Sequence, residues 1–186
     1  MRKIILGICV SLFTCAATAQ GRPADRGPPA HAGAAPIAGS YISRFVSETI
    51  YTPNSPGGIP CPVLITIPNS GLLTCESAQT LHLTPDGTIV TYYNPQNAPP
   101  GTSAVGTWTA NTRSTYQSKT VSVRYDANGN VAGWLVVKAQ STANQDYSGS
   151  QGTFESLNYT ANQDPLDPNT VAPVRTTGTF VTQRVQ

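Results

Sequence analysis

Residues 120–130 read Thr-Val-Ser-Val-Arg-Tyr-Asp-Ala-Asn-Gly-Asn, and they hold the two signals that decide the fold. In the first six residues, β-branched and aromatic side chains alternate with polar ones, which is the period of a strand with one buried face. The last five, Asp126 to Asn130, are turn formers, because Asn and Gly tolerate the positive φ angles of tight hairpins. The stretch therefore predicts a strand that turns directly into a second, antiparallel strand.

The period of two continues through most of the chain after residue 39. Residues 80–84, Thr-Leu-His-Leu-Thr, alternate in the same way and precede the turn Pro85-Asp86-Gly87. No stretch of a dozen residues free of Gly and Pro carries the apolar stripe of a helix. Eight or nine sequential antiparallel strands predict an all-β, up-and-down β-barrel, with a β-sandwich as the alternative. The predicted strands lie near residues 39–48, 62–67, 79–84, 88–93, 104–110, 116–126, 131–141, 148–159 and 175–185.

A second pattern, Gly followed by Ser or Thr and then an aromatic residue, recurs where predicted strands begin or bend. Glycine permits a bend or a close approach between strands, and the aromatic side chain two residues later can fill the adjacent interior. The pattern therefore supports a closed barrel wall. It occurs at Gly39-Ser40-Tyr41, Gly106-Thr107-Trp108, Gly152-Thr153-Phe154 and Gly178-Thr179-Phe180.

The N-terminal segment predicts export. Residues 1–19 carry two cations, a short apolar run and Ala17-Thr18-Ala19, which is the pattern of a signal peptide. Residues 20–38 are rich in Pro, Gly and Ala and predict a flexible arm, because they offer little apolar surface to bury. Residues 39–186 then form a single barrel domain. We expect the mature protein to be periplasmic or extracellular.

The number and positions of the cysteines are consistent with export to an oxidising compartment. Cys9 and Cys15 lie within the predicted signal peptide, so a single pair, Cys61 and Cys75, remains in the mature chain. In an oxidising compartment an even pair predicts a disulfide. No C-x-x-C motif accompanies it, so we expect a structural bridge without a redox role.

Charge is scarce in this sequence. Charged residues make up 11% of the chain, against about a quarter in an ordinary soluble domain. Without residues 1–19 the chain holds nine Lys and Arg and nine Asp and Glu, so the mature protein is formally neutral. This balance argues against a nucleic-acid partner and against strong membrane association.

The residues that usually carry catalysis are also scarce. Outside the arm, His82 is the only histidine available as a base, and its place between Leu81 and Leu83 predicts that it faces solvent. His, Cys and carboxylate residues are not clustered as metal ligands would be, and no phosphate or dinucleotide motif occurs. We therefore assign no catalytic residue, no metal and no cofactor, and the inventory favours a non-enzymatic protein.

The chain resembles the lipocalins and the wider calycin group over about residues 39–185. The opening Gly39-Ser40-Tyr41 is similar to theirs, and Arg184 on the last strand is able to lie across it. The central run resembles secreted bacterial lipocalin-like proteins of unknown function. This resemblance implies an exported calycin-type barrel, and its motifs build the barrel and carry no catalysis. The run comprises residues 83–88, Gly106-Thr107-Trp108, residues 124–130 and Gly133.

The leading functional hypothesis is a binding barrel for a small, largely apolar ligand, or else an uncharacterised structural barrel. It rests on the neutral mature chain, the barrel pattern and aromatic residues of which some should point inward. The candidate ligand-binding residues are Tyr41, Trp108, Tyr125, Trp134 and Arg124.

Two alternatives stay open at this point. One is an isomerase or cyclase on a barrel of the allene oxide cyclase or dirigent type, with Arg124, Glu155 and Tyr159 as candidate polar groups. The other is a small outer-membrane barrel. The low aromatic content and the C-terminal Arg184-Val185-Gln186 argue against that second alternative.

Overall fold

The computed structural model describes residues 36–61, 65–67, 71–73, 75–93 and 103–186. The predicted signal peptide and nearly all of the predicted arm lie outside these residues. Within them the chain forms no helix, and so none that is long and apolar enough to cross a membrane. The strands are β1 (Gly39–Thr52), β2 (Ser55–Pro60), β3 (Ile65–Ile67), β4 (Gly71–Leu73), β5 (Glu76–Leu83), β6 (Thr88–Tyr93), β7 (Ala104–Ala110), β8 (Thr115–Tyr125), β9 (Val131–Ala143), β10 (Gly149–Thr160) and β11 (Val174–Arg184).

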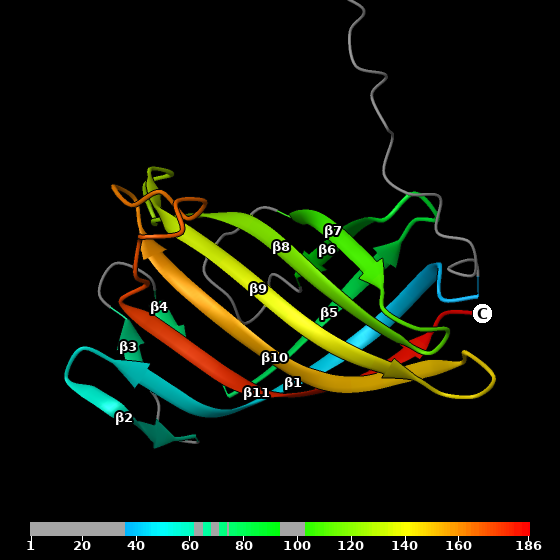
Figure 1. The fold of residues 1–186 in the computed structure, drawn as a ribbon. Coiled ribbons are helices and arrows are strands. Elements are labelled where there is room, and N and C mark those ends of the chain that lie inside the picture. The colour runs from blue at the N-terminus through cyan, green and yellow to red at the C-terminus, as the bar shows by residue number, and fades with distance from the viewer. Residues whose placement is uncertain (1–35, 62–64, 68–70, 74, 94–102) are drawn as a thin grey trace, which may run out of the picture.

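Eight of these strands close into an antiparallel, up-and-down barrel (Figure 1). Neighbours from β5 to β11 are consecutive in sequence, and β1 pairs with both β5 and β11. The pairing of β1 with β11 closes the ring, from Tyr41 opposite Arg184 to Tyr51 opposite Arg175. The predicted barrel is thus confirmed, and the sandwich alternative is wrong. Closure leaves these eight strands without a free edge along most of their length.

Strand β1 changes its neighbour part of the way along. Its first half, up to Val46, pairs with β5, and its second half, from Thr49, pairs with β2. The β1–β11 register shifts between Ser47 and Thr49, as at a β-bulge. The sequence of β2, Ser-Pro-Gly-Gly-Ile-Pro, predicts a loop because Gly and Pro dominate it. It is an edge strand in the structure because β1 extends beyond the ring and offers it a partner.

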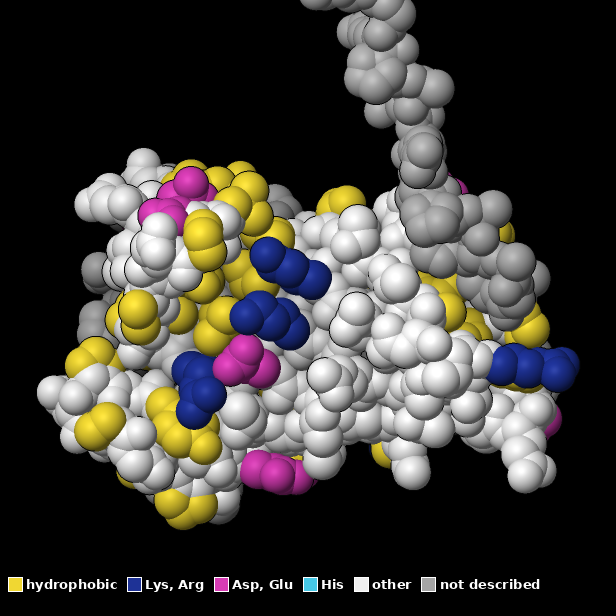
Figure 2. All heavy atoms as spheres, viewed as in Figure 1, with side chains coloured by type: hydrophobic (Ala, Val, Ile, Leu, Met, Phe, Trp, Pro, Cys, Tyr) yellow, Lys and Arg dark blue, Asp and Glu magenta, His cyan; other side chains and the backbone are white. Residues whose placement is uncertain are grey.

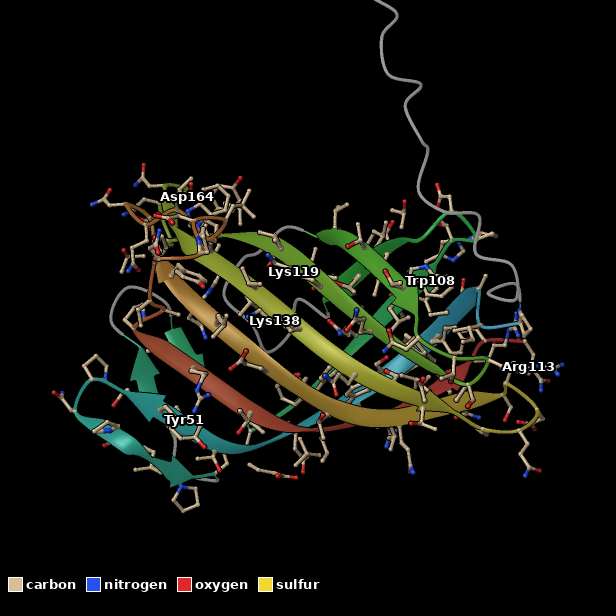
Figure 3. All side chains as sticks on the ribbon, viewed as in Figure 1. Tyr51, Trp108, Arg113, Lys119, Lys138 and Asp164 are labelled. Atoms are coloured by element: carbon tan, nitrogen blue, oxygen red, sulfur yellow. A yellow bond between two sulfur atoms is a disulfide. The ribbon has the colours of Figure 1, made fainter. Side chains whose placement is uncertain are left out.

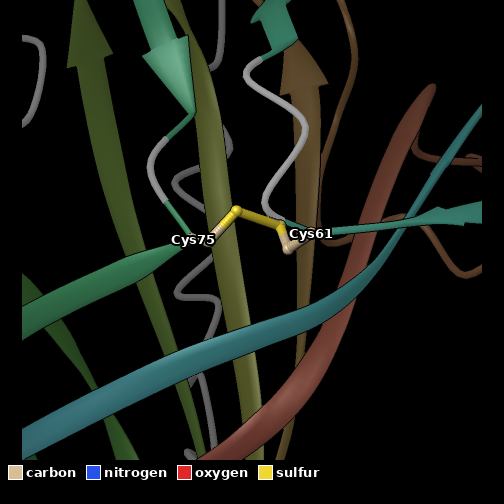
Figure 4. Close-up of a disulfide and its surroundings, with 2 residues drawn as sticks. All are labelled: Cys61 and Cys75. Carbon is tan, nitrogen blue, oxygen red and sulfur yellow. A yellow bond between two sulfur atoms is a disulfide. The ribbon is translucent and has the colours of Figure 1, made fainter.

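The predicted disulfide joins Cys61 and Cys75, whose Cα atoms are 5.8 Å apart (Figure 4). Both cysteines also bond to β1 through the main chain. The amide of Ser47 donates to the carbonyl of Cys75 at 2.6 Å, and the amide of Cys61 donates to the carbonyl of Glu48 at 3.0 Å. The bridge therefore ties together the two sides of β1 at the point where it changes neighbour.

One end of the barrel interior is closed by a cluster of large apolar side chains. Tyr41 and Trp108 are 3% and 1% exposed, and their polar atoms are satisfied locally. The Tyr41 hydroxyl donates to the Ile37 carbonyl at 2.7 Å, and Trp108 Nε1 donates to the Thr84 carbonyl at 2.9 Å. The cluster comprises Ile37, Tyr41, Leu81, Leu83, Ile89, Trp108 and Tyr116.

Arg184 crosses this closed end, as the lipocalin resemblance implies. Its guanidinium lies 5.9 Å from the centre of the Tyr41 ring and donates to the carbonyls of Pro36 and Ala38. A side chain at Gly39 would meet the same guanidinium at 2.9 Å. Glycine at this position thus makes room for the arginine.

A layer of three phenylalanines fills the middle of the barrel. Phe45 stacks on Phe180 with ring centres 5.1 Å apart and meets Phe154 edge-on at 5.2 Å. Gly152 lies opposite Phe180 and Gly178 lies opposite Phe154, so each ring covers the glycine of the neighbouring strand. This reciprocal arrangement explains why the Gly-Thr-Phe sequence occurs on both β10 and β11.

Candidate functional site

Beyond the phenylalanine layer, the inward-facing residues of β8, β10 and β11 are mostly polar. Alternation along these strands places hydroxyl and amide side chains, and one arginine, on the inner face. Ile50 and Val174 pack beside them. We call this region the polar end of the barrel. It comprises Ser122, Arg124, Ser156, Asn158 and Thr176.

Arg124 and Asn158 interact across β9 at the polar end. Arg124 lies opposite Gly133, and Asn158 lies opposite Leu135 two residues further along β9. Arg124 Nη1 donates to Asn158 Oδ1 at 2.6 Å. Because a guanidinium can only donate, this bond fixes the orientation of the amide and directs Nδ2 elsewhere.

Asn158 Nδ2 is buried and has no hydrogen-bond partner within the described chain, and the same holds for Thr176 Oγ1. The two residues are 5% and 1% exposed. Buried polar atoms in folded proteins nearly always have a partner, so each exception needs an explanation. Here a donor on β10, held by Arg124, and a hydroxyl on the neighbouring strand β11 are both unpartnered. The polar end thus presents hydrogen-bonding capacity that the described protein does not use.

A second set of unpartnered atoms lies between the closed end and the phenylalanine layer. Gln79 Oε1 and Thr91 Oγ1 are buried without partners, and both residues line a cavity of about 30 Å³. A space of this size accommodates a buried water that two or more polar groups can bind. It is far too small for an organic ligand.

The structure separates the five candidate ligand-binding residues predicted from the sequence. Tyr41 and Trp108 face inward in the closed end, and Arg124 faces inward at the polar end. Trp134 faces outward, opposite Val123 and Tyr159, because Gly133 and Leu135 take the inner face. Tyr125 is half-buried and follows the register shift at the end of β8. Of the five, only Arg124 lies at the polar end.

The polar groups considered for an isomerase do not converge. Arg124 faces the interior, whereas Glu155 is on the outer face, 3.5 Å from Lys138 Nζ and 3.3 Å from Arg175 Nη1. Tyr159 is buried on the outer side beside Trp134. His82 is exposed beside Ser40, as strand alternation predicts. In the described part of the chain, no group of three or more His, Cys, Asp or Glu is placed to hold a metal ion.

Burial at the closed end keeps the Tyr41 hydroxyl neutral. Burial raises the pKa of the Tyr41 hydroxyl above its ordinary value, and the nearby Arg184 cation offsets part of this rise. Tyr41 is therefore neutral over the physiological range and acts as a hydrogen-bond donor. The closed end is a structural plug.

Asn158 and Thr176 were not predicted as site residues, because the sequence argument searched for ionisable and aromatic groups. A signal was present nevertheless. Asn158 shares its parity with Gly152 and Phe154 on β10, and Thr176 shares its parity with Gly178 and Phe180 on β11. Once the Gly-x-aromatic pattern is taken to face inward, both residues fall on the inner face.

Comparison with known proteins gives no independent assignment for this site. No family model matches the chain, and no curated protein matches its sequence. The described residues form an eight-stranded, antiparallel, up-and-down β-barrel with β2 added at an edge, the separate β3–β4 pair and the Cys61–Cys75 disulfide.

Proposed function

We propose that this protein is a non-catalytic binding barrel that holds a small, largely apolar molecule carrying at least one hydrogen-bond-accepting group. The accepting group would lie at the polar end, against Asn158 Nδ2 and Thr176 Oγ1, and the apolar part would lie toward the phenylalanine layer. The observation that carries the proposal is a pair of buried, unpartnered polar atoms at the polar end, Asn158 Nδ2 beside Arg124 and Thr176 Oγ1 on the neighbouring strand β11.

The chemistry of these groups supports an acceptor-rich ligand. Asn158 Nδ2 can only donate, and the Arg124 guanidinium that holds the other side of the amide also only donates. Thr176 can donate or accept. A carboxylate or carbonyl group would suit two such donors, since hydrogen bonds between a charged group and a partner are the stronger ones. The Phe45, Phe154 and Phe180 rings offer the apolar contact that most small-molecule sites have.

The test is to extract the purified protein with organic solvent and identify the bound molecules by mass spectrometry. Thr176→Val removes the unpartnered hydroxyl at nearly constant shape. Because no protein hydrogen bond is lost, the free energy of unfolding should stay constant or rise. Retention of the extracted ligand should fall.

Thr182→Val is the matched control on the same strand. Thr182 Oγ1 lies 2.8 Å from Ser150 Oγ and accepts from the Ser150 amide at 2.9 Å, at the other end of the barrel. This variant should lose about 1–3 kcal/mol of stability and keep the ligand. If the extract is empty, or if Thr176→Val leaves ligand retention unchanged, the proposal is wrong.

A further inference from the structure

We propose that the outer face of strands β8, β9 and β10 is the contact surface of a two-fold symmetric homodimer. Three zones follow one another along these strands on the outside of the ring: a basic zone in mid-strand, an apolar patch beside it, and an acidic tip at the strand ends. The inference is independent of the proposed ligand site, whose residues face the interior.

The basic zone is built around two exposed lysines. Lys119 on β8 lies directly opposite Lys138 on β9, and like charges in this position repel. Glu155 on β10 is shared between Lys138 and Arg175, so these four residues carry a net charge of +2. The carboxylate of Glu48 lies two strands further round the ring, on β1. A carboxylate supplied from outside the chain would therefore reduce the repulsion between the lysines.

The apolar patch consists of two cross-strand rows next to the lysines. The members of each row lie directly opposite one another on β8, β9 and β10, and alternation places them on the same outer face as Lys119 and Lys138. Val136 and Tyr159 are buried, and the other four are partly exposed. Contiguous apolar surface on the outside of a protein is typical of an interaction site. The first row is Val121, Val136 and Leu157, and the second is Val123, Trp134 and Tyr159.

The acidic tip comprises the turn between β8 and β9 and the loop between β10 and β11, which lie at the same end of the barrel (Figure 1). Its charge comes from Asp126, Asp164 and Asp167, whose carboxyl groups are ionised at neutral pH. Residues 126–132 and 160–174 contain no Lys or Arg. The tip therefore carries a formal charge opposite to that of the basic zone.

The tip also presents apolar side chains to solvent. Leu166 and Val171 are 68% and 81% exposed, the highest values among the large apolar residues that the structure describes. Figure 2 shows Asp and Glu side chains, hydrophobic side chains, and Lys and Arg side chains in this order across one face. In Figure 3, Asp164 lies at the tip, and Lys119 and Lys138 lie further along the strands.

A second copy of this chain matches both charged zones at once. From Lys119 to Asp126 the chain covers about 23 Å of strand, and the apolar patch lies between them. A two-fold axis through the patch reverses the direction of one copy, so the acidic tip of each copy meets the lysines of the other and the patches pack together. A partner with a single sign of charge would match one zone and be repelled by the other.

The test is sedimentation equilibrium of the purified protein at concentrations up to about 0.1 mM. We expect a dimer that dissociates as the salt concentration rises, because salt screens exposed charges. Lys119→Glu/Lys138→Glu and Asp164→Lys/Asp167→Lys should each weaken association about a hundredfold or more, since each variant sets like charges against one another in both contacts. A mixture of the two variants should dimerise again, because both contacts of the mixed pair then join opposite charges.

Arg44→Glu is the matched control, because Arg44 is an exposed cation on β1 outside the three zones, and its reversal should leave association unchanged. All the substituted residues are exposed, so every variant should keep the circular dichroism spectrum of the wild type. The proposal is overturned if the wild type stays monomeric, if the mixture of folded variants stays monomeric, or if Arg44→Glu weakens association equally. None of these results bears on ligand retention inside the barrel, so the two proposals fail separately.

Discussion

Gly178→Ala is a small substitution that tests whether close strand approach holds the barrel together. Gly178 lies on β11 opposite Ser47 on one side and Phe154 on the other. An added Cβ atom would overlap the carbonyl oxygen of Val46 and lie 2.9 Å from Phe154 Cε1. Real Cβ atoms essentially never show contacts under 3.0 Å. The backbone of β1 and the Phe154 ring must therefore both move.

The size of the effect follows from two opposing terms. Overpacking of this kind costs about 1–3 kcal/mol. Replacing Gly with Ala also reduces the conformational entropy of the unfolded chain, which raises the free energy of unfolding by about 0.4–1 kcal/mol. We expect a net loss of about 1–2 kcal/mol, which in a domain of this size lowers the melting temperature by about 2–4 °C per kcal/mol.

Urea unfolding followed by circular dichroism measures this loss, and Gly57→Ala is the matched control. Nothing lies within 4 Å of a Cβ atom at Gly57, so that variant should be neutral or stabilised by up to about 1 kcal/mol. If the two variants have the same unfolding midpoint, close approach at Gly178 is not a constraint and the explanation of the Gly-Thr-Phe pattern is wrong.

Three further predictions concern the barrel. Reduction of the Cys61–Cys75 disulfide should cost about 3 kcal/mol of stability, seen as a lower urea midpoint with reductant, and Cys61→Ser/Cys75→Ser should be insensitive to reductant. Phe180→Ala should cost about 3–5 kcal/mol by the same assay, because it removes one of three packed rings. The pKa of Tyr41 is raised in the folded state, so its contribution to stability is present below about pH 10 and is lost as the pH rises through the folded value. Tyr41→Phe should therefore lose less stability than the wild type on going to alkaline pH, and an equal loss would contradict the assignment.

Most of the barrel could be predicted from the sequence, because its strands obey simple rules. Alternation with period two located the strands, and the Asp126–Asn130 turn located one hairpin directly. The strand β2 was not predicted, because Ser-Pro-Gly-Gly-Ile-Pro has no strand propensity. It forms because β1 continues beyond its pairing with β5 and offers β2 a hydrogen-bonding partner. Tertiary context decided that element, as it often does for short edge strands.

The residues of the polar end were harder to predict. Arg124 comes to lie opposite Gly133 through the β8–β9 register, which depends on turn geometry that alternation does not reveal. The inward direction of Arg124 and the outward direction of Trp134 depend on the same register. Alternation assigns residues to two faces, and only closure of the ring decides which face is inside.

The seam between β1 and β11 has a consequence for the order of folding. The other strand pairs of the ring join strands that follow one another in the sequence. The one exception is the pair of β1 and β5, which β2, β3 and β4 separate along the chain. The seam instead joins Tyr41 to Arg184, nearly the whole domain apart. Hairpins can form as the chain emerges, but ring closure must wait for the last strand and carries the largest loop entropy. A circular permutant that joins residues 39 and 186 by a short linker and opens at Gly129 would make the seam local and should fold faster to the same barrel.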